Sequence, residues 1–361
     1  MTPHIFAAAS DFTPSTIQGQ MPPDFRKLPK IELHCHLDAS VRVATVADLG
    51  RQIGLTLPEP LEPALVAPEI CLDLADFLLR IDLALEVMQH RDQLVRVARE
   101  LVEDWAADGV VYGEVRFAPQ LHLRQGLSLQ QVVEAVDEGL RQGRQEFGVA
   151  TGLILCCLRH EPSARSVEIA KLALANRDKV CALDLAGDEA RFSGAPHAEA
   201  FALARAEGLR RTVHAGEAAG ADSIREALEL LGAERIGHGV RIEESGELED
   251  AVKDAGVALE MCPLSNVQTR ATSSLASHPI ARLLRNGLRV TVSTDARTVS
   301  ATTVSAEFYR LAKTFGWGAE EFWRCQHHAA DAAFVSAQAR IALASRLDEA
   351  TPPGNPRSRS L

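Results

Sequence analysis

Several features are scarce or missing in this chain, and each one excludes a class of protein. The 361 residues carry a formal net charge of −11, so the chain lacks the basic surface that binds nucleic acid. No apolar run approaches the roughly 20 residues that a membrane helix needs. Residues 1–27 have no basic start followed by an apolar core, so we expect no secretory signal. The sequence therefore predicts a cytoplasmic protein that binds neither nucleic acid nor membranes.

Paired cysteine motifs are also missing. The chain has seven cysteines, an odd number, and no C-x-x-C spacing. Most lie inside apolar runs, as Cys156 and Cys157 do after Leu155. This pattern is typical of buried free thiols in a reducing compartment.

Short apolar runs alternate with amphipathic stretches along most of the chain. Hydrophobic residues make up 46% of the sequence, enough for a large core. The runs have the composition of buried parallel strands, and strict alternation of eight strands with helices predicts an α/β fold of the (β/α)8 barrel type. In such a barrel the functional site lies at the carboxyl ends of the strands. The expected strands are Ile31–His36, Val110–Phe117, Gly152–Arg159, Val180–Ala186, Arg211–His214, Arg235–Gly239, Val257–Cys262 and Arg289–Ser293.

Helix signals fill the gaps between these strands. Ser128 and Asp222 are expected to cap two of the helices. The gap after the first strand is long, and residues 72–107 have strongly helical spacing. This helical insertion is either a lid over the barrel mouth or extra packing away from the substrate. We expect a flexible arm at residues 1–27, a single domain at 28–350 and a flexible tail at 351–361.

Metal-ligating side chains stand where strands should end. His34 and His36 are two residues apart in the first strand, so both imidazoles can point to the same side. His214 ends the fifth strand and Asp295 follows the eighth. Three histidines and one carboxylate leave a position for water on zinc, so the sequence predicts one Zn²⁺ per chain.

Two further groups near these ends can move protons. Glu217 follows His214 by three residues and could be a fifth ligand, a surface charge or a proton carrier, the last being favoured by the spacing. His238 lies between Gly237 and Gly239, which allow close backbone approach, and is either a catalytic group or a structural histidine.

Other polar residues receive structural interpretations. Glu114 and Arg116 are expected to form an ion pair at the barrel mouth, without a catalytic role. His278 is expected at a helix N-terminus. Structural roles are also expected for His197, His327 and His328.

Taken in order, these motifs resemble the adenosine deaminase family of zinc amidohydrolases. The resemblance runs from about residue 28 to beyond residue 300. It rests on six segments: Pro29–Asp38 with its Leu-His-Cys-His-Leu-Asp motif, Leu183–Glu189, His214–Glu217, Ile236–Gly239, Met261–Asn266 and Ser293–Asp295.

The resemblance implies roles beyond metal binding by His34, His214 and Asp295. Glu217 would donate a proton to purine N1, and His238 would orient or deprotonate the metal-bound water. Gly187 would contact purine N3 through its backbone, and Asp38 would face the sugar. His36 would lie at the substrate as well as at the metal.

The implied reaction is hydrolytic deamination of adenosine or deoxyadenosine. An alternative is another 6-aminopurine nucleoside such as aminodeoxyfutalosine, and a third possibility is a catalytically silent binding protein. The sequence departs from the family pattern at Ala39, where a glycine or a similarly small residue is usual, and at Ala296, where an Asp or Asn would contact purine N7. The oligomeric state stays open.

Overall fold

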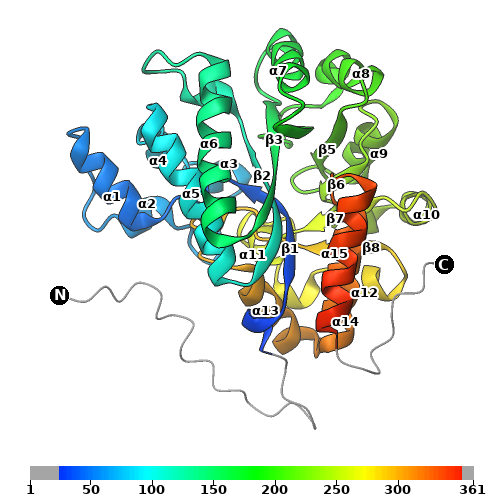
Figure 1. The fold of residues 1–361 in the computed structure, drawn as a ribbon. Helices are drawn as coiled ribbons and strands as arrows, with labels where there is room; N and C mark the ends of the chain where they lie inside the picture. The colour runs from blue at the N-terminus through cyan, green and yellow to red at the C-terminus, as the bar shows by residue number, and fades with distance from the viewer. Residues whose placement is uncertain (1–23, 352–361) are drawn as a thin grey trace.

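The computed structural model describes residues 24–351 and forms a parallel barrel surrounded by helices (Figure 1). One sheet contains eight strands in the order β1 to β8, and each pairs in parallel with the next. The predicted (β/α)8 barrel is confirmed, and all eight expected strands are present. They are β1 (Lys30–His36), β2 (Val110–Phe117), β3 (Ala150–Leu158), β4 (Val180–Ala186), β5 (Arg210–Ala215), β6 (Arg235–His238), β7 (Ala258–Met261) and β8 (Arg289–Val292).

The last strand returns to the first strand at one point. An isolated parallel bridge joins Cys35 to Asp295. The Asp295 N–H donates to the His34 carbonyl at 2.8 Å, and the His36 N–H donates to the Asp295 carbonyl at 2.7 Å. The barrel therefore closes beside predicted metal ligands.

The helices that follow the strands form the outer ring. Ser128 caps α6 as predicted, because its hydroxyl accepts from the Gln131 N–H at 3.2 Å. The cap expected at Asp222 is wrong: Gly220 occupies the N-cap, and Asp222 lies in the first turn, where its charge complements the helix dipole. The ring and the C-terminal region contain α6 (Leu129–Phe147), α7 (Ser163–Ala175), α8 (Ala198–Ala206), α9 (Ala221–Glu229), α10 (Gly246–Asp254), α11 (Pro263–Gln268), α12 (Ile280–Arg285), α13 (Val304–Phe315), α14 (Ala319–Ala332) and α15 (Ala337–Ala350).

The insertion after β1 consists of several short helices and one long one. They are α1 (Val43–Gln52), α2 (Glu62–Leu65), α3 (Leu74–Leu78), α4 (Asp82–Glu86) and α5 (Arg91–Ala107). The stretch at 72–107 is therefore three helices. The longest, α5, packs on α6 and β2 as part of the outer ring. Within the insertion, the segment around α3 borders the cavity described below. A lid role for this segment stays a prediction.

Most of the predicted N-terminal arm, and nearly all of the predicted tail, lie outside the described residues. The end of the arm is structured, because Phe25–Lys27 form a 3₁₀ helix (η2). The Phe25 ring is buried, with its centroid 5.6 Å from that of Phe308 and 5.4 Å from that of Phe322. Packed structure thus begins before the predicted boundary at residue 27.

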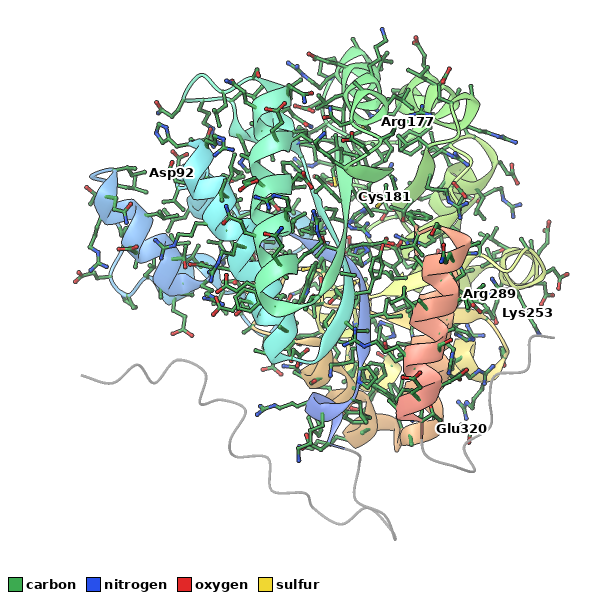
Figure 2. All side chains as sticks on the ribbon, in the orientation of Figure 1. Asp92, Arg177, Cys181, Lys253, Arg289 and Glu320 are labelled. Carbon is green, nitrogen blue, oxygen red and sulfur yellow. The ribbon has the colours of Figure 1, made fainter. Side chains whose placement is uncertain are left out.

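The distribution of side chains follows the barrel architecture. Charged groups such as Arg177, Lys253 and Glu320 lie on the outside of the molecule (Figure 2). All seven cysteines are free, and all except Cys181 are fully buried. No helix within residues 24–351 has both the length and the apolar character needed to span a bilayer.

Candidate metal centre and active site

Four predicted ligands converge at the carboxyl ends of β1, β5 and β8. The nearest ligand atoms of His34, His36, His214 and Asp295 all lie within 4.8 Å of one another. The Nε2 atoms of His36 and His214 are 3.1 Å apart, and Asp295 Oδ1 lies 3.4 Å from His34 Nε2 and 3.5 Å from His36 Nε2. Asp295 has a φ of 60°, an uncommon left-handed conformation that turns its carboxylate toward the histidines.

This donor set fits a zinc ion. Zinc–ligand distances of about 2.0–2.1 Å in a tetrahedral site imply ligand atoms roughly 3.4 Å apart, close to the separations observed. The Nε2 atom of His34 is buried and makes no hydrogen bond within residues 24–351, although its other ring nitrogen is bonded. A buried nitrogen without a hydrogen-bond partner is expected where a metal ion would be the partner.

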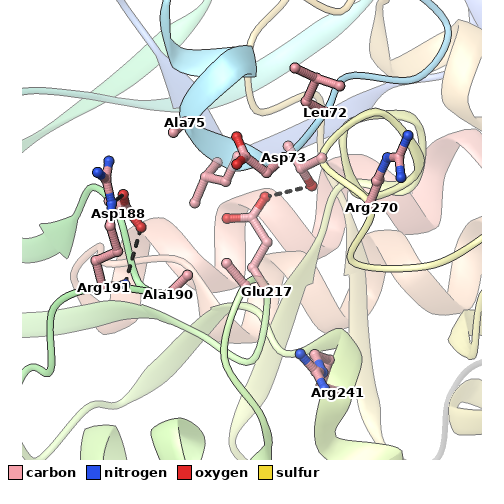
Figure 3. A pocket seen from close by; sticks show the side chains of 12 residues that line it. Leu72, Asp73, Ala75, Asp188, Ala190, Arg191, Glu217, Arg241 and Arg270 are labelled. Carbon is pink, nitrogen blue, oxygen red and sulfur yellow. Dashed lines mark hydrogen bonds and ion pairs between the residues drawn. The ribbon is translucent and has the colours of Figure 1, made fainter.

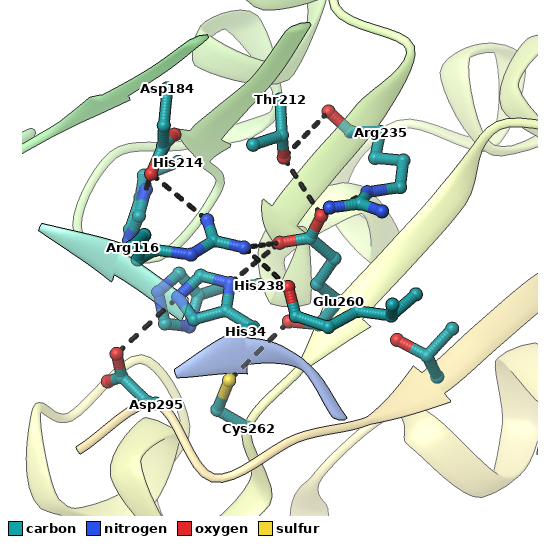
Figure 4. Close-up of polar contacts among 12 residues, drawn as sticks. His34, Arg116, Asp184, Thr212, His214, Arg235, His238, Glu260, Cys262 and Asp295 are labelled. Atoms are coloured by element: carbon teal, nitrogen blue, oxygen red, sulfur yellow. Dashed lines mark hydrogen bonds and ion pairs between the residues drawn. The ribbon is translucent and has the colours of Figure 1, made fainter. Parts of the chain in front are cut away.

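Two carboxylates hold the outer nitrogens of these histidines. Glu260 Oε2 lies 2.8 Å from His34 Nδ1, and Asp184 Oδ2 lies 3.1 Å from His214 Nδ1 (Figure 4). Such contacts fix the ring orientation and direct Nε2 at the metal position. Neither carboxylate was predicted as a site residue, although a charged residue within an apolar strand was a usable signal for both.

An arginine joins the two carboxylates beneath the site. Arg116 Nη1 lies 3.0 Å from Asp184 and Nη2 lies 2.7 Å from Glu260, all three side chains being fully buried (Figure 4). The predicted ion pair between Glu114 and Arg116 is wrong. Glu114 instead pairs with Arg235 at 2.6 Å. Although Glu114 and Arg116 are only two residues apart on β2, each reaches a charged partner on another strand.

Glu217 is a buried carboxyl group beside the four predicted metal ligands. Its Oε1 accepts from the Thr269 hydroxyl at 3.0 Å (Figure 3). Burial, together with the negative charges of Asp295 and Glu189, raises the pKa of Glu217 well above its usual value. The raised pKa favours the protonated form of Glu217, which is the form that an acid role requires.

The turn that carries Glu217 is organised by Glu189. The Glu189 carboxylate accepts from four consecutive backbone N–H groups, Gly216 to Ala219, at 2.6–3.1 Å, and from the Ser223 hydroxyl. Gly216 has a φ of 70°, which only glycine adopts readily. Glu189 lies within the Leu183–Glu189 motif but had no predicted role.

His238 lies at the end of β6 and faces Glu217. Its Nε2 is 3.6 Å from Glu217 Oε2, and its φ of 62° is unusual for a residue with a side chain. A Cβ at Gly237 would lie 3.0 Å from the His34 ring, so the glycine permits the close approach that the sequence suggested. Burial, reinforced by His34, lowers the pKa of His238 well below its usual value.

The predicted substrate contacts also lie at the strand ends. Asp38 is 6% exposed, and its Oδ1 has no hydrogen-bond partner among the described residues. Burial raises the pKa of Asp38 to about 6. Gly187 directly follows β4 with a φ of 100°, a conformation that favours glycine. Both positions thus provide polar groups that a ligand could satisfy.

A cavity of about 380 Å³ opens beside Glu217, at the lower end of the size range of small-molecule sites. Residues Leu72–Ala75 line one side of it, and Thr269, Arg270 and Arg191 lie elsewhere on its wall (Figure 3). This arrangement places the start of α3 opposite the group predicted to donate a proton.

Ala296 lies in a small apolar cluster. Its side chain is 1% exposed and packs with a group that includes Ala39, Phe77 and Val299. The two departures from the family pattern therefore lie in one cluster, and position 296 offers no polar side chain to a substrate.

The remaining histidines differ in their contacts. His197 bonds to Ser166 and to the Arg159 carbonyl, and His328 bonds to the backbone of Val290, as expected for structural residues. His278 accepts from the Ile280 N–H at the start of α12, and it also contacts Asn266.

Comparisons with known proteins show which family the sequence matches. The sequence model described as adenosine deaminase matches residues 29–350. The adenosine deaminase of Clostridium acetobutylicum is 40% identical over 325 residues, which cover 89% of this chain and 97% of the relative.

Solved structures of an adenine deaminase and of an amidohydrolase share the fold. The adenine deaminase of Arthrobacter aurescens superposes with a TM-score of 0.84 and 30% identity, covering 89% of this chain and 98% of the neighbour. An amidohydrolase from Burkholderia ambifaria with bound Zn has a TM-score of 0.82 and 25% identity, covering 90% of this chain and 92% of the neighbour.

Proposed function

Because the chain belongs to the adenosine deaminase family, we propose that it hydrolyses adenosine and deoxyadenosine to inosine and deoxyinosine with release of ammonia. The observation that carries this proposal is the position of Glu217, a buried carboxyl group with a raised pKa beside four side chains that could hold a metal ion. Replacing an amino group on a purine ring by oxygen needs a nucleophile and an acid in this proximity.

We propose Zn²⁺ as the ion, one per chain, held by His34, His36, His214 and Asp295. The support is the donor set, the ligand spacing and the unpartnered His34 nitrogen. When bound, zinc lowers the pKa of its water to about 7 and so supplies a nucleophile at neutral pH.

The chain's own groups would then act on the substrate. Glu217 donates its proton to purine N1, which makes C6 more electrophilic, and His238 contacts the attacking water. Asp38 binds a sugar hydroxyl through its Oδ1 atom, which has no partner in the described part of the chain. The Gly187 backbone contacts N3, and His36, the most exposed of the ligands, borders the substrate as well as the metal.

Ammonia release from purified zinc-loaded protein tests the proposal. The substrates should include adenosine, deoxyadenosine, adenine and 5′-modified aminopurine nucleosides such as aminodeoxyfutalosine. We expect the nucleosides to react and adenine to react poorly. Preference for a 5′-modified nucleoside would identify the alternative substrate, and no ammonia from any of them would favour a silent binding protein.

A further inference from the structure

A short chain of buried polar groups leads away from His238 through the ring nitrogen that does not face Glu217. Asn266 Nδ2 lies 3.0 Å from His238 Nδ1, and Asn266 Oδ1 lies 3.2 Å from His278 Nε2. All three side chains are buried. Asn266 belongs to α11, and His278 lies in the segment before α12. Neither residue is a predicted metal ligand or substrate contact.

Two backbone amides fix the direction of every hydrogen bond in this chain. The Ile280 N–H, which can only donate, lies 3.1 Å from His278 Nδ1. Burial lowers the pKa of His278 to about 3, so the ring is neutral and its proton lies on Nε2. That proton is donated to Asn266 Oδ1, which also accepts from the Cys262 N–H at 3.3 Å.

The orientation of the Asn266 amide follows. If the amide were rotated by 180°, its NH₂ group would face two donors, from Cys262 and from His278, and both hydrogen bonds would be lost. The observed orientation leaves the NH₂ group to donate to His238 Nδ1.

We propose that Asn266 and His278 are positioning residues that hold neutral His238 in its Nε2–H tautomer. His238 then presents a hydrogen-bond donor to the catalytic pocket and has no lone pair there. A ring that already carries a proton on Nε2 cannot remove another proton at that atom. Of the two roles open to His238, orienting the attacking water and deprotonating it, the chain selects orientation.

The tautomer can be read directly by NMR. Long-range ¹H–¹⁵N correlation of zinc-loaded protein labelled with ¹⁵N-histidine separates protonated from unprotonated ring nitrogens, and His238→Gln identifies the signals of His238. We expect a protonated Nε2 and an unprotonated Nδ1 at neutral pH. The reverse pattern in the parent protein would overturn the inference, whatever the variants show.

The isosteric variant Asn266→Asp tests the cause. A carboxylate only accepts, so Nδ1 of His238 should become protonated. Loss of one oriented donor typically costs about 10²–10³-fold in kcat, and we expect a loss in that range with unchanged zinc content. Asn176→Asp, at an equally buried asparagine outside the site, is the matched control and should leave both readouts unchanged. Parent-like nitrogen signals or parent-like turnover in Asn266→Asp would refute the positioning role.

The catalytic meaning of this tautomer rests on the proposed deamination, but its measurement does not. A protein with the expected nitrogen signals and no deaminase activity would refute the proposed function alone. An active protein with an unprotonated Nε2 would refute the present inference alone.

Discussion

Replacement of Arg116 by methionine should weaken both the fold and the metal site. Arg116 is fully buried and contacts Asp184, Glu260 and the Leu33 carbonyl at 2.7–3.0 Å. The burial that would otherwise raise the pKa of Glu260 is opposed by Arg116 and Arg235, which hold that pKa well below its usual value. Methionine keeps the apolar stem and removes the charge, so two buried carboxylates lose a shared partner.

The expected size of the effect follows from this burial. Breaking a buried ion pair by removing one partner costs about 3–5 kcal/mol, a large part of the roughly 5–15 kcal/mol that stabilises a typical domain. Since Asp184 and Glu260 also orient His214 and His34, zinc affinity should fall by about 10–100-fold.

Urea unfolding of the zinc-free protein measures the first effect, and transfer of zinc to a chromogenic chelator measures the second. Arg42→Met is the matched control, because Arg42 pairs with Glu103 and Asp104 on the partly exposed surface and should cost no more than about 1 kcal/mol. If Arg116→Met were as stable as Arg42→Met and held zinc with the parent affinity, the positioning argument for the buried charges would be wrong.

Four further predictions address single groups. His214→Ala should lose most of its zinc, measured by metal analysis; full zinc content in a folded variant would remove His214 from the ligand set. Glu217→Gln should keep fold and zinc but lower turnover by about 10²–10⁴-fold, and a loss of only a few-fold would move the acid role elsewhere. Ala296→Asp should raise kcat/KM for adenosine by roughly one to two decades if the carboxylate reaches N7. It should also lower stability, because the carboxylate enters an apolar cluster. Unchanged kinetics on all aminopurines would show that position 296 does not face the base. Burial lowers the pKa of Lys30 from 10.5 to about 8, so between these pH values the unfolded chain keeps the Lys30 proton and the folded protein has released it. The free energy of unfolding should therefore rise by up to about 3 kcal/mol as the pH increases across this range. Lys30→Met, compared with the parent in urea titrations at both ends of the range, should lack the rise.

The strands were the most predictable part of the fold. Each is buried on both faces, so each appears as a compact apolar run, and the ligands His34, His36 and His214 stand at the ends of such runs. The insertion was less predictable, because residues 72–107 keep helical spacing across the turns that separate α3, α4 and α5. Spacing along a helix does not reveal where the chain changes direction.

The supporting residues of the site were largely missed, and the reason is physical. Asp184, Glu260 and Arg116 act through partners on other strands, and a single strand shows only a charged residue in apolar surroundings. The misassigned pairing of Glu114 with Arg116 has the same cause. His278 was correctly placed near a helix start, but its contact with Asn266 depends on packing between two segments that the sequence alone does not juxtapose.

The closure between β8 and β1 has a consequence for how the protein comes apart. Glu32 and Thr294, which meet across this junction, are 262 residues apart in the chain. An ion held by His34 on one side and Asp295 on the other would fasten the two ends of the sheet together, as a covalent staple would. Unlike a covalent link, the ion leaves the unfolded chain, so its stabilisation follows mass action and is about 2.7 kcal/mol at a free metal concentration 100 times the Kd. Metal loading should therefore raise the free energy needed to separate β8 from β1. The same ion would serve both the stability of the barrel and its activity.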